Sequence, residues 1–184
     1  MTSFTFAPGP EHAIAQDAHG ALAFAFERPQ DGLLVDALVD RAFGPGRFAK
    51  TAERIRERAR LRHELSICAW SGETLAGAVR QWSILVGETP AVFLGPIAVD
   101  TAERHRGLGA GLMRRAVAAS QGAGERLMLL VGDMSLFAQF GFEVVPPGRV
   151  ILPGPADPRR VLWLARNGHG LDGVSGPVRP VRVA

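Results

Sequence analysis

The sequence predicts a mixed α/β fold, and two stretches near the middle of the chain carry that prediction. The first, LGPIAVDTAERHRGLGAGLMRRAV at residues 94–117, passes from an apolar run through three glycines directly into a helical pattern. The second, RLMLLVG at residues 126–132, is apolar without interruption, which is typical of a strand buried on both faces. A strand, a glycine turn, a helix and a buried strand in this order indicate an α/β unit at the centre of the chain.

Length and composition are those of a globular protein. A chain of 184 residues is most simply one domain, and we expect a loose extension over residues 1–20 and a single domain over residues 21–184. Hydrophobic residues make up 47% of the chain and charged residues 21%. The net charge is only +3, although the isoelectric point is about 10.3, because Lys50 is the only lysine among many arginines. So mild an excess of positive charge does not favour nucleic acid as a partner.

Several other classes of protein are disfavoured. Cys68 is the only cysteine, so no internal disulfide can form, and we expect it to be a buried strand residue rather than a nucleophile. The histidines show no metal-ligand spacing, so we predict no metal. The N-terminus lacks the pattern of a signal peptide, and no run approaches the roughly 20 apolar residues of a membrane span. We therefore expect a cytoplasmic protein with no membrane partner; a homodimer is compatible with the sequence.

In the N-terminal part, residues 21–27 predict a short strand that Pro29 ends. A helix is expected over residues 31–44, with Leu34, Leu38 and Ala42 on its apolar face.

The stretch RFAKTAERIRERARLRHE, residues 47–64, predicts an amphipathic helix. Its apolar face comprises Phe48, Ala52, Ile55 and Ala59. The opposite face is rich in arginine and has two interpretations, a binding surface for phosphate or RNA and an ordinary solvated face. We favour the solvated face, because Glu53 and Glu57 are interleaved with the arginines as partners.

Three strands should follow, at residues 65–70, 75–86 and 91–99. The turn-like separators SGET and GETP indicate an antiparallel meander. Alternation on the middle strand places Arg80 and Trp82 on one face and Gln81 on the other, and leaves open which face is inward.

Beyond the glycine turn, we expect the helix to end near Gln121, where glycines follow. The remaining expected elements are the buried strand 126–132, a short helix at 134–139, strands at 140–145 and 160–166, and an irregular tail after Asn167.

The glycine turn suggests a phosphate site. The first amides of a helix have no intrahelical partners and lie at the positive end of its dipole, and glycines let a phosphate approach the backbone. A P-loop would need glycine-lysine followed by serine or threonine, which this turn lacks. A dinucleotide fingerprint would need its third glycine where Leu112 or Arg114 stands, so that template fails as well.

A third template, R/Q-x-x-G-x-G/A, fits Arg106, Gly109 and Gly111. With the preceding LGPIAV and the later GDMSLFAQFGFEVV, the chain resembles the GNAT superfamily of acyl-CoA-dependent N-acetyltransferases. The later block is similar to the GDPxYYxRFGF element of the YhbS-like subgroup, and the tail LDGVSGPVRP is similar to the C-terminal segment of that group. The resemblance runs from about Phe24 to the end and is strongest between Leu94 and Val145.

The resemblance implies a central mixed sheet splayed between two parallel strands, here 91–99 and 126–132, with helices on both faces. Acetyl-CoA, the implied co-substrate, would lie where these strands part. Its pantetheine arm would pair with the backbone of Ile97, Ala98 and Val99. The pyrophosphate would sit on the backbone of the glycine turn, which comprises Arg106, Gly107, Leu108, Gly109, Ala110, Gly111 and Leu112.

The implied reaction is direct attack of an unidentified amine on the thioester of acetyl-CoA. Many members of the superfamily carry a basic glutamate on the strand that matches 91–99, and this chain has no carboxylate there. By position, Asp133 is the nearest candidate for the base, and an ordered water is the alternative. Asp133 has an equally plausible structural interpretation, as the N-cap of the following short helix.

The usual acid of the superfamily is missing. The position of its tyrosine is occupied by Phe137, Leu136 replaces the other tyrosine of the subgroup, and the whole chain contains no tyrosine. A phenyl ring can line the thioester pocket but cannot donate a proton. Ser135 could deliver a water, although it could equally serve the start of the helix, or the thiolate could leave unassisted. Two hypotheses therefore remain, an N-acetyltransferase and a non-catalytic acyl-CoA-binding sensor or interaction domain.

Overall fold

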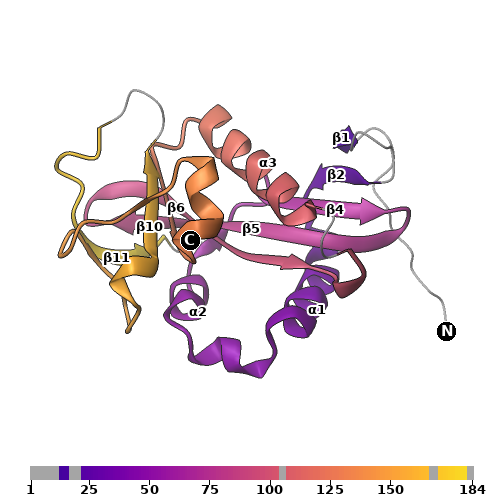
Figure 1. The fold of residues 1–184 in the computed structure, drawn as a ribbon, viewed down its shortest axis with the longest axis horizontal. Coiled ribbons are helices and arrows are strands. Elements are labelled where there is room, and N and C mark those ends of the chain that lie inside the picture. The colour runs from indigo at the N-terminus through magenta and orange to yellow at the C-terminus, as the bar shows by residue number, and fades with distance from the viewer. Residues whose placement is uncertain (1–12, 17–21, 104–106, 166–169, 182–184) are drawn as a thin grey trace. The chain divides into compact units, whose positions relative to one another are not determined.

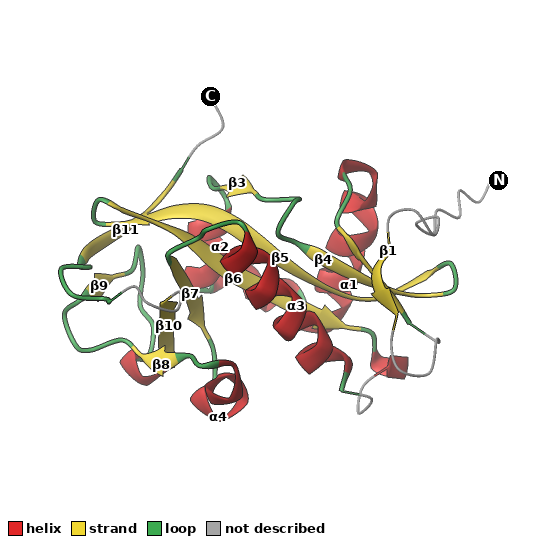
Figure 2. Cartoon of the chain, turned by 90° about the horizontal axis from the view of Figure 1, so that it is seen from above, coloured by secondary structure: helices red, strands yellow, loops and turns green. Residues whose placement is uncertain are grey.

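The computed structural model describes residues 13–16, 22–103, 107–165 and 170–181. The chain groups into two compact units, of which the first spans residues 1–44, 63–80 and 96–116 and the second spans 45–62, 81–95 and 117–184. Three elements contribute residues to both units: strand β5 (Thr74–Val86), strand β6 (Thr89–Val99) and helix α3 (Leu108–Gly122). The predicted mixed α/β fold is confirmed, because strands pair in both parallel and antiparallel directions and helices accompany them (Figures 1 and 2).

In the first unit, neighbouring strands are β1 (Ala13–Gln16), β2 (Ala23–Phe26), β4 (Ile67–Ser71) and the first half of β5. All of these pairs are antiparallel, with Ala25 opposite Cys68 and Cys68 opposite Ala78. Cys68 is fully buried in its strand, as expected, and burial raises the pKa of its thiol well above the ordinary value. Strand β1 corrects the expectation of a loose extension up to residue 20, because its backbone pairs with the edge of β2.

Helix α1 (Gly32–Phe43) covers one face of this unit, after a short 3-10 turn, η2 (Pro29–Asp31). Its buried residues are Val35, Leu38 and Val39, which cluster with residues of the sheet. Of the predicted apolar face, Leu38 is buried and Ala42 packs against the same cluster, as expected, whereas Leu34 is 43% exposed and Val35 is buried in its place. Two adjacent apolar residues at 34 and 35 allow either choice, and only contact with the sheet decides between them.

Helices lie on both faces of the sheet in the first unit. Ala78 clusters with α1, whereas a Cβ on the neighbouring Gly77 would lie 3.0 Å from Leu112 and 3.3 Å from Leu108, both on α3. Successive residues of a strand face opposite sides of its sheet, so α1 and α3 cover opposite faces. A further 3-10 turn, η4 (Thr101–Glu103), follows β6 in this unit.

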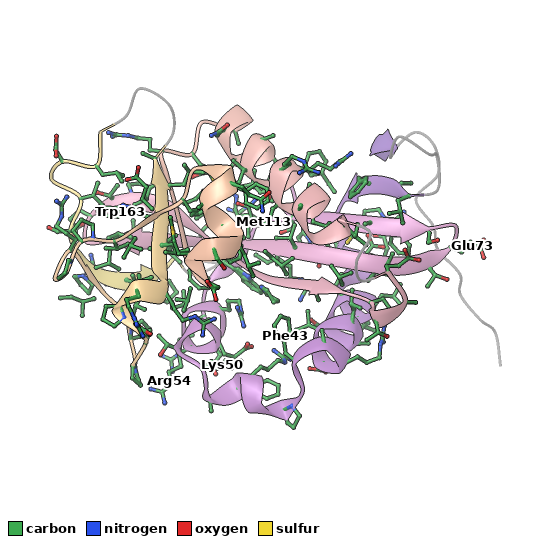
Figure 3. All side chains as sticks on the ribbon, in the orientation of Figure 1. Phe43, Lys50, Arg54, Glu73, Met113 and Trp163 are labelled. Carbon is green, nitrogen blue, oxygen red and sulfur yellow. The ribbon has the colours of Figure 1, made fainter. Side chains whose placement is uncertain are left out.

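The second unit contains the other end of the mixed sheet. After the second half of β5 and the first half of β6, the strand order is β7 (Leu127–Val131), β10 (Val161–Ala165) and β8 (Glu143–Val144). Strand β7 is parallel to β6, whereas β10 is antiparallel to both β7 and β8. The core of this unit includes Phe93, Leu129 and Trp163, and Trp163 is labelled in Figure 3.

The C-terminal tail is not irregular throughout, which corrects the expectation from the sequence. Strand β11 (Gly176–Pro180) pairs with β5, placing Val178 opposite Val86, and also runs parallel to β9 (Val150–Ile151). The five residues GPVRP contain two prolines and carry no strand signal of their own. They are extended because β5 offers them an edge for pairing.

The predicted helix at 47–64 is also wrong in extent. Helix α2 spans only Thr51–Arg56, after the 3-10 turn η3 (Pro45–Ala49), and Phe48 is 55% exposed rather than buried. Beyond it, β3 (Arg60–Leu61) pairs with Ser83 and Trp82 of β5, which requires extended backbone. Pairing with β5 therefore overrides the helical pattern of the sequence.

The remaining short elements of the second unit are α4 (Met134–Phe137) and the 3-10 turns η5 (Ala138–Phe140) and η6 (Pro158–Arg160). Within the described ranges, no helix is both long and apolar enough to cross a membrane.

Candidate functional site

In the second unit, strands β6 and β7 pair over only a short stretch before their ladder ends. Their parallel ladder joins Val92 to Met128 and Phe93 to Leu129, and within the described residues it extends no further. Yet β6 continues to Val99 and β7 to Val131. Backbone amides and carbonyls beyond a parted ladder need other partners, and an extended ligand with amide groups can supply them.

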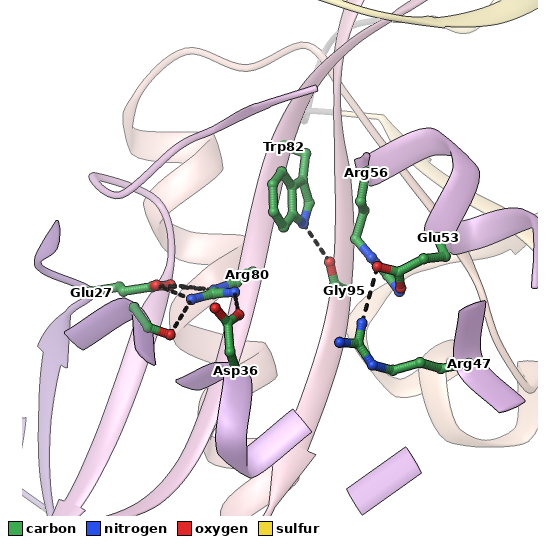
Figure 4. Close-up of polar contacts among 9 residues, drawn as sticks. Glu27, Asp36, Arg47, Glu53, Arg56, Arg80, Trp82 and Gly95 are labelled. Carbon is green, nitrogen blue, oxygen red and sulfur yellow. Dashed lines mark hydrogen bonds and ion pairs between the residues drawn. The ribbon is translucent and has the colours of Figure 1, made fainter. Parts of the chain in front are cut away.

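Gly95 marks the point at which β6 leaves the ladder. Its φ is +126°, a value that residues with a side chain rarely adopt. Its carbonyl oxygen accepts a hydrogen bond of 2.7 Å from Trp82 Nε1 of β5 (Figure 4). The sequence signal for this irregularity was Gly95 followed by Pro96, but nothing in the sequence pointed to the indole.

A charged cluster formed by residues of η3 and α2 lies next to Gly95. Glu53 accepts hydrogen bonds from Arg56 at 2.5 Å and from Arg47 at 3.0 Å, and all three side chains are only 10–15% exposed (Figure 4). Arg56 Nη1 is 3.9 Å from the place that a Cβ on Gly95 would occupy. The expectation that Glu53 is a partner of the arginines is therefore confirmed, although the helix that carries it is short.

In the first unit, the predicted phosphate turn opens helix α3. Gly107 has a φ of +71°, and α3 begins at Leu108. The amide of Gly111 donates to the carbonyl of Gly107 at 3.0 Å. The amides of Leu108, Gly109 and Ala110 come before this bond, in the first turn of the helix. Arg106, the first residue of the template, lies outside the described residues.

The three glycines of the turn differ in their surroundings. No described residue lies within 4 Å of the place that a Cβ on Gly107 would occupy, and its positive φ is one that residues with a side chain rarely adopt. A Cβ on Gly109 would come no closer than 3.9 Å to Val99. A Cβ on Gly111 would lie 3.4 Å from the buried ring of Phe24, so Gly111 has a packing role that sequence reasoning missed.

The end of β6 and the first turn of α3 meet around Gly77 of β5. A Cβ there would be 3.2 Å from the carbonyl oxygen of Ala98 and would also clash with the leucines of α3. Ala98 is buried, whereas Ile97 and Val99 are half-buried. The first unit thus brings the strand predicted to meet pantetheine next to the turn predicted to meet pyrophosphate.

Arg80 is a buried polar residue of the first unit that the sequence left without a role. Its guanidinium donates to Glu27 at 2.6–3.0 Å and to Asp36 at 2.5 Å (Figure 4). Burial acts to lower the pKa of Arg80, but the hydrogen bonds and charges of Glu27 and Asp36 raise it overall. These bonds join β5 to α1 and to the residue that follows β2, so Arg80 has a structural role.

At the carboxyl end of β7, Asp133 is the N-cap of α4. It accepts hydrogen bonds from the Ser135 amide at 3.1 Å and from the Ser135 hydroxyl at 2.9 Å. These bonds lower the pKa of Asp133, which weakens it as a base, since a weakly basic carboxylate binds protons poorly. The capping interpretation of both residues is thus confirmed by geometry, whereas their catalytic roles stay predictions.

Phe137, in place of the expected tyrosine, packs on bare backbone. A Cβ on Gly132 would lie 2.3 Å from Phe137 Cε2, and the Phe137 ring meets Phe142 edge-on at a centroid distance of 6.2 Å. Leu136 is 61% exposed. The ring of Phe137, the last residue of α4, therefore packs against Gly132 and Phe142.

Comparisons with known proteins agree with this arrangement. The model of the acetyltransferase (GNAT) family matches residues 33–142. This is more than half of the chain, and the protein therefore belongs to the GNAT acetyltransferase family. A search of curated proteins finds no match.

Among solved structures, the chain is similar to the GNAT family N-acetyltransferase YhbS from Escherichia coli in complex with CoA, with 25% identity and a TM-score of 0.73. The match covers 88% of this chain and 90% of that one. A GNAT family acetyltransferase from Brucella melitensis in complex with acetyl-CoA shares the fold at 23% identity and a TM-score of 0.63, over 87% and 96% of the two chains. The ribosomal-protein-S18-alanine N-acetyltransferase from Escherichia coli does so at 17% identity and a TM-score of 0.56, over 82% and 97%.

Proposed function

We propose that this protein is an acetyl-CoA-dependent N-acetyltransferase that transfers an acetyl group to an amine by direct attack. The observation that carries the proposal is the parting of β6 from β7 after Phe93 and Leu129. Family membership and the CoA complex of the similar YhbS structure support it.

The proposed binding mode uses backbone more than side chains. The pantetheine arm pairs with Ile97, Ala98 and Val99, which follow the parted ladder in the same strand. The pyrophosphate binds the first amides of α3, where Gly109 leaves space above the backbone. Phe137 lines the thioester pocket as an apolar wall.

In the proposed reaction, the nitrogen lone pair of the neutral amine attacks the thioester carbonyl carbon. A backbone amide of Ile97 or Ala98 polarises the carbonyl oxygen. The carbon–sulfur bond then breaks, the electron pair leaves with the thiolate, and the nitrogen loses a proton. An ordered water fits the role of base better than Asp133, because that carboxylate already accepts two hydrogen bonds from Ser135. The thiolate leaves unassisted or takes a proton from a water next to Ser135.

Thiol release from acetyl-CoA, measured over a panel of small amines and peptide amino termini, tests this proposal. We expect release that depends on the amine, together with acetyl-CoA binding in calorimetry. A well-folded protein that binds no acetyl-CoA would contradict the proposal.

One observation favours a second candidate function, an acyl-CoA-binding sensor without catalysis. Phe137 stands where a tyrosine is expected, and the loss of one acid–base contribution typically lowers a rate by about 10²–10⁴-fold. In a working enzyme, Phe137→Tyr should raise turnover or shift its pH profile. Acetyl-CoA binding without turnover in either protein would instead favour the sensor.

The proposal also includes a cytoplasmic location and a homodimer as one assembly. Cell fractionation and light scattering of the purified protein test these two points.

A further inference from the structure

A side-chain hydrogen bond holds β6 at the residue where it leaves β7. Trp82 Nε1 of β5 donates to the carbonyl oxygen of Gly95 at 2.7 Å (Figure 4). Gly95 lies two residues after Phe93, the last residue of β6 in the parallel ladder with β7. The bond therefore acts just beyond the end of the ladder that joins β6 to β7.

The local backbone explains why such a bond is needed. The φ of +126° at Gly95 departs from regular strand geometry. Gly95 is buried, and buried carbonyl oxygens need hydrogen-bond donors; the indole of Trp82 is one donor to this carbonyl. An indole N–H can only donate, so it suits a lone carbonyl oxygen.

Trp82 differs in exposure from the other two tryptophans of the chain. Its side chain is half-buried, whereas Trp70 is 1% and Trp163 4% exposed. A tryptophan that served only to fill the core would be expected to resemble the other two. The indole of Trp82 instead combines a fixed polar contact with partial exposure.

We infer that Trp82 is a positioning residue for acyl-CoA. By holding the Gly95 carbonyl, it fixes the backbone of β6 just before Ile97, Ala98 and Val99, the residues that the proposed function pairs with the pantetheine arm. This inference rests on the proposed function. It adds Trp82 of β5 to the residues that form the site, although β5 makes no contact with the cofactor in that proposal.

The inference predicts that the two halves of the cofactor respond differently. The nucleotide half, adenosine 3′-phosphate 5′-diphosphate, would contact the glycine turn without the pantetheine strand. Acetyl-CoA would contact both the glycine turn and the strand that pairs with pantetheine. Loss of the indole donor should therefore weaken acetyl-CoA and leave the nucleotide unchanged, whereas general loss of structure would weaken both.

The experiment compares Trp82→Phe with Trp163→Phe, a matched change at a buried tryptophan on β10. Calorimetry with acetyl-CoA and with the free nucleotide is performed on wild type and both variants. Since one hydrogen bond contributes about 1 kcal/mol, we expect Trp82→Phe to bind acetyl-CoA roughly fivefold to tenfold more weakly. Its affinity for the nucleotide should match wild type, and Trp163→Phe should bind both ligands normally.

Fluorescence supplies a second measurement that needs no stable Trp82 variant. Acetyl-CoA should change the tryptophan emission of wild type and of Trp163→Phe, and the free nucleotide should not. An unchanged emission, an unchanged acetyl-CoA affinity in Trp82→Phe, or an equal loss for both ligands would overturn the role of Trp82 while leaving the proposed function intact. Failure of wild type to bind acetyl-CoA would instead overturn the proposed function itself.

Discussion

Helices α3 and α4 begin in opposite ways, although each follows a strand of the mixed sheet. Helix α4 is capped by its own chain, because Asp133 accepts hydrogen bonds from Ser135. Helix α3 opens through Gly107 with a positive φ, and its first turn contains no acidic residue. At the start of α4 a carboxylate of the chain itself lies at the positive end of the helix dipole, whereas at the start of α3 we propose that the diphosphate of acetyl-CoA takes this place.

The comparison also shows that the residues just before a helix can serve two purposes, a cap or a site for an external anion. Acidic and small residues before a helix predict a cap, whereas glycines without an acid predict an external anion. Both interpretations of Asp133 were open from the sequence, and the geometry favours the cap. Four substitutions, two of them paired with a control variant, test the contrast between the two starts.

The largest effect is expected from Gly109→Leu at the start of α3. The side chain would enter the space above the first amides, where Val99 is the one described residue near the Cβ position, and would exclude the diphosphate. We expect acetyl-CoA affinity to fall at least about 100-fold, or about 2.7 kcal/mol, in calorimetry. Circular dichroism should show an unchanged fold. Retention of normal affinity would contradict the assignment of this helix start to the diphosphate.

A smaller effect is expected from Gly111→Leu, and it should appear in stability. The leucine would displace the ring of Phe24 and the Arg115 guanidinium, which lies 3.6 Å above that ring. Such overpacking typically costs about 1–3 kcal/mol, measured by denaturant unfolding. Gly122→Leu is the matched control at the other end of α3, because nothing lies within 4 Å of its Cβ position. Equal losses in both variants would show that packing on Phe24 is not the reason for Gly111.

Asp133→Ala should lower Tm modestly at neutral pH, because the cap of α4 is lost. The folded-state pKa of Asp133 is lowered by the Ser135 hydrogen bonds, so its contribution is present above the ordinary pKa of 3.8. It should disappear as the pH falls through the lower folded-state value. The difference in Tm between wild type and variant, followed from pH 7 to pH 3, checks this. Ser135→Ala removes only the hydroxyl bond and should have a smaller effect; equal Tm values for wild type and Asp133→Ala would contradict the cap.

The smallest effect is expected from Gly109→Ala, and its two parts have opposite signs. Alanine is the better helix former, so stability without ligand should rise by about 0.5 kcal/mol. Its Cβ sits close to the backbone that the diphosphate approaches, so the increase in Tm caused by acetyl-CoA should shrink. Thermal melts with and without acetyl-CoA measure both parts. A variant that is stabilised and binds as wild type would show that bare backbone is not required at this residue.

Local patterns predicted much of the fold and of the candidate site. The glycine turn before α3, the unbroken apolar run of β7 and the cap at Asp133 each depend on residues close together in sequence. The same is true of the Glu53 partnership with neighbouring arginines. Backbone geometry and side-chain chemistry act over a few residues in these cases, so the signal is present in the sequence itself.

Contacts between distant residues decided the rest. Strand β11 and the short strand β3 are extended because β5 offers them an edge, against the propensity of their own residues. The packing of Gly111 on Phe24 and the bond from Trp82 to Gly95 join elements far apart along the chain or on separate strands. The sequence by itself determined the class of fold and the position of the helix start, because those depend on local periodicity and backbone freedom. Only the tertiary structure decided which carbonyl the indole of Trp82 binds, because that choice depends on where two strands are brought together by the folded core.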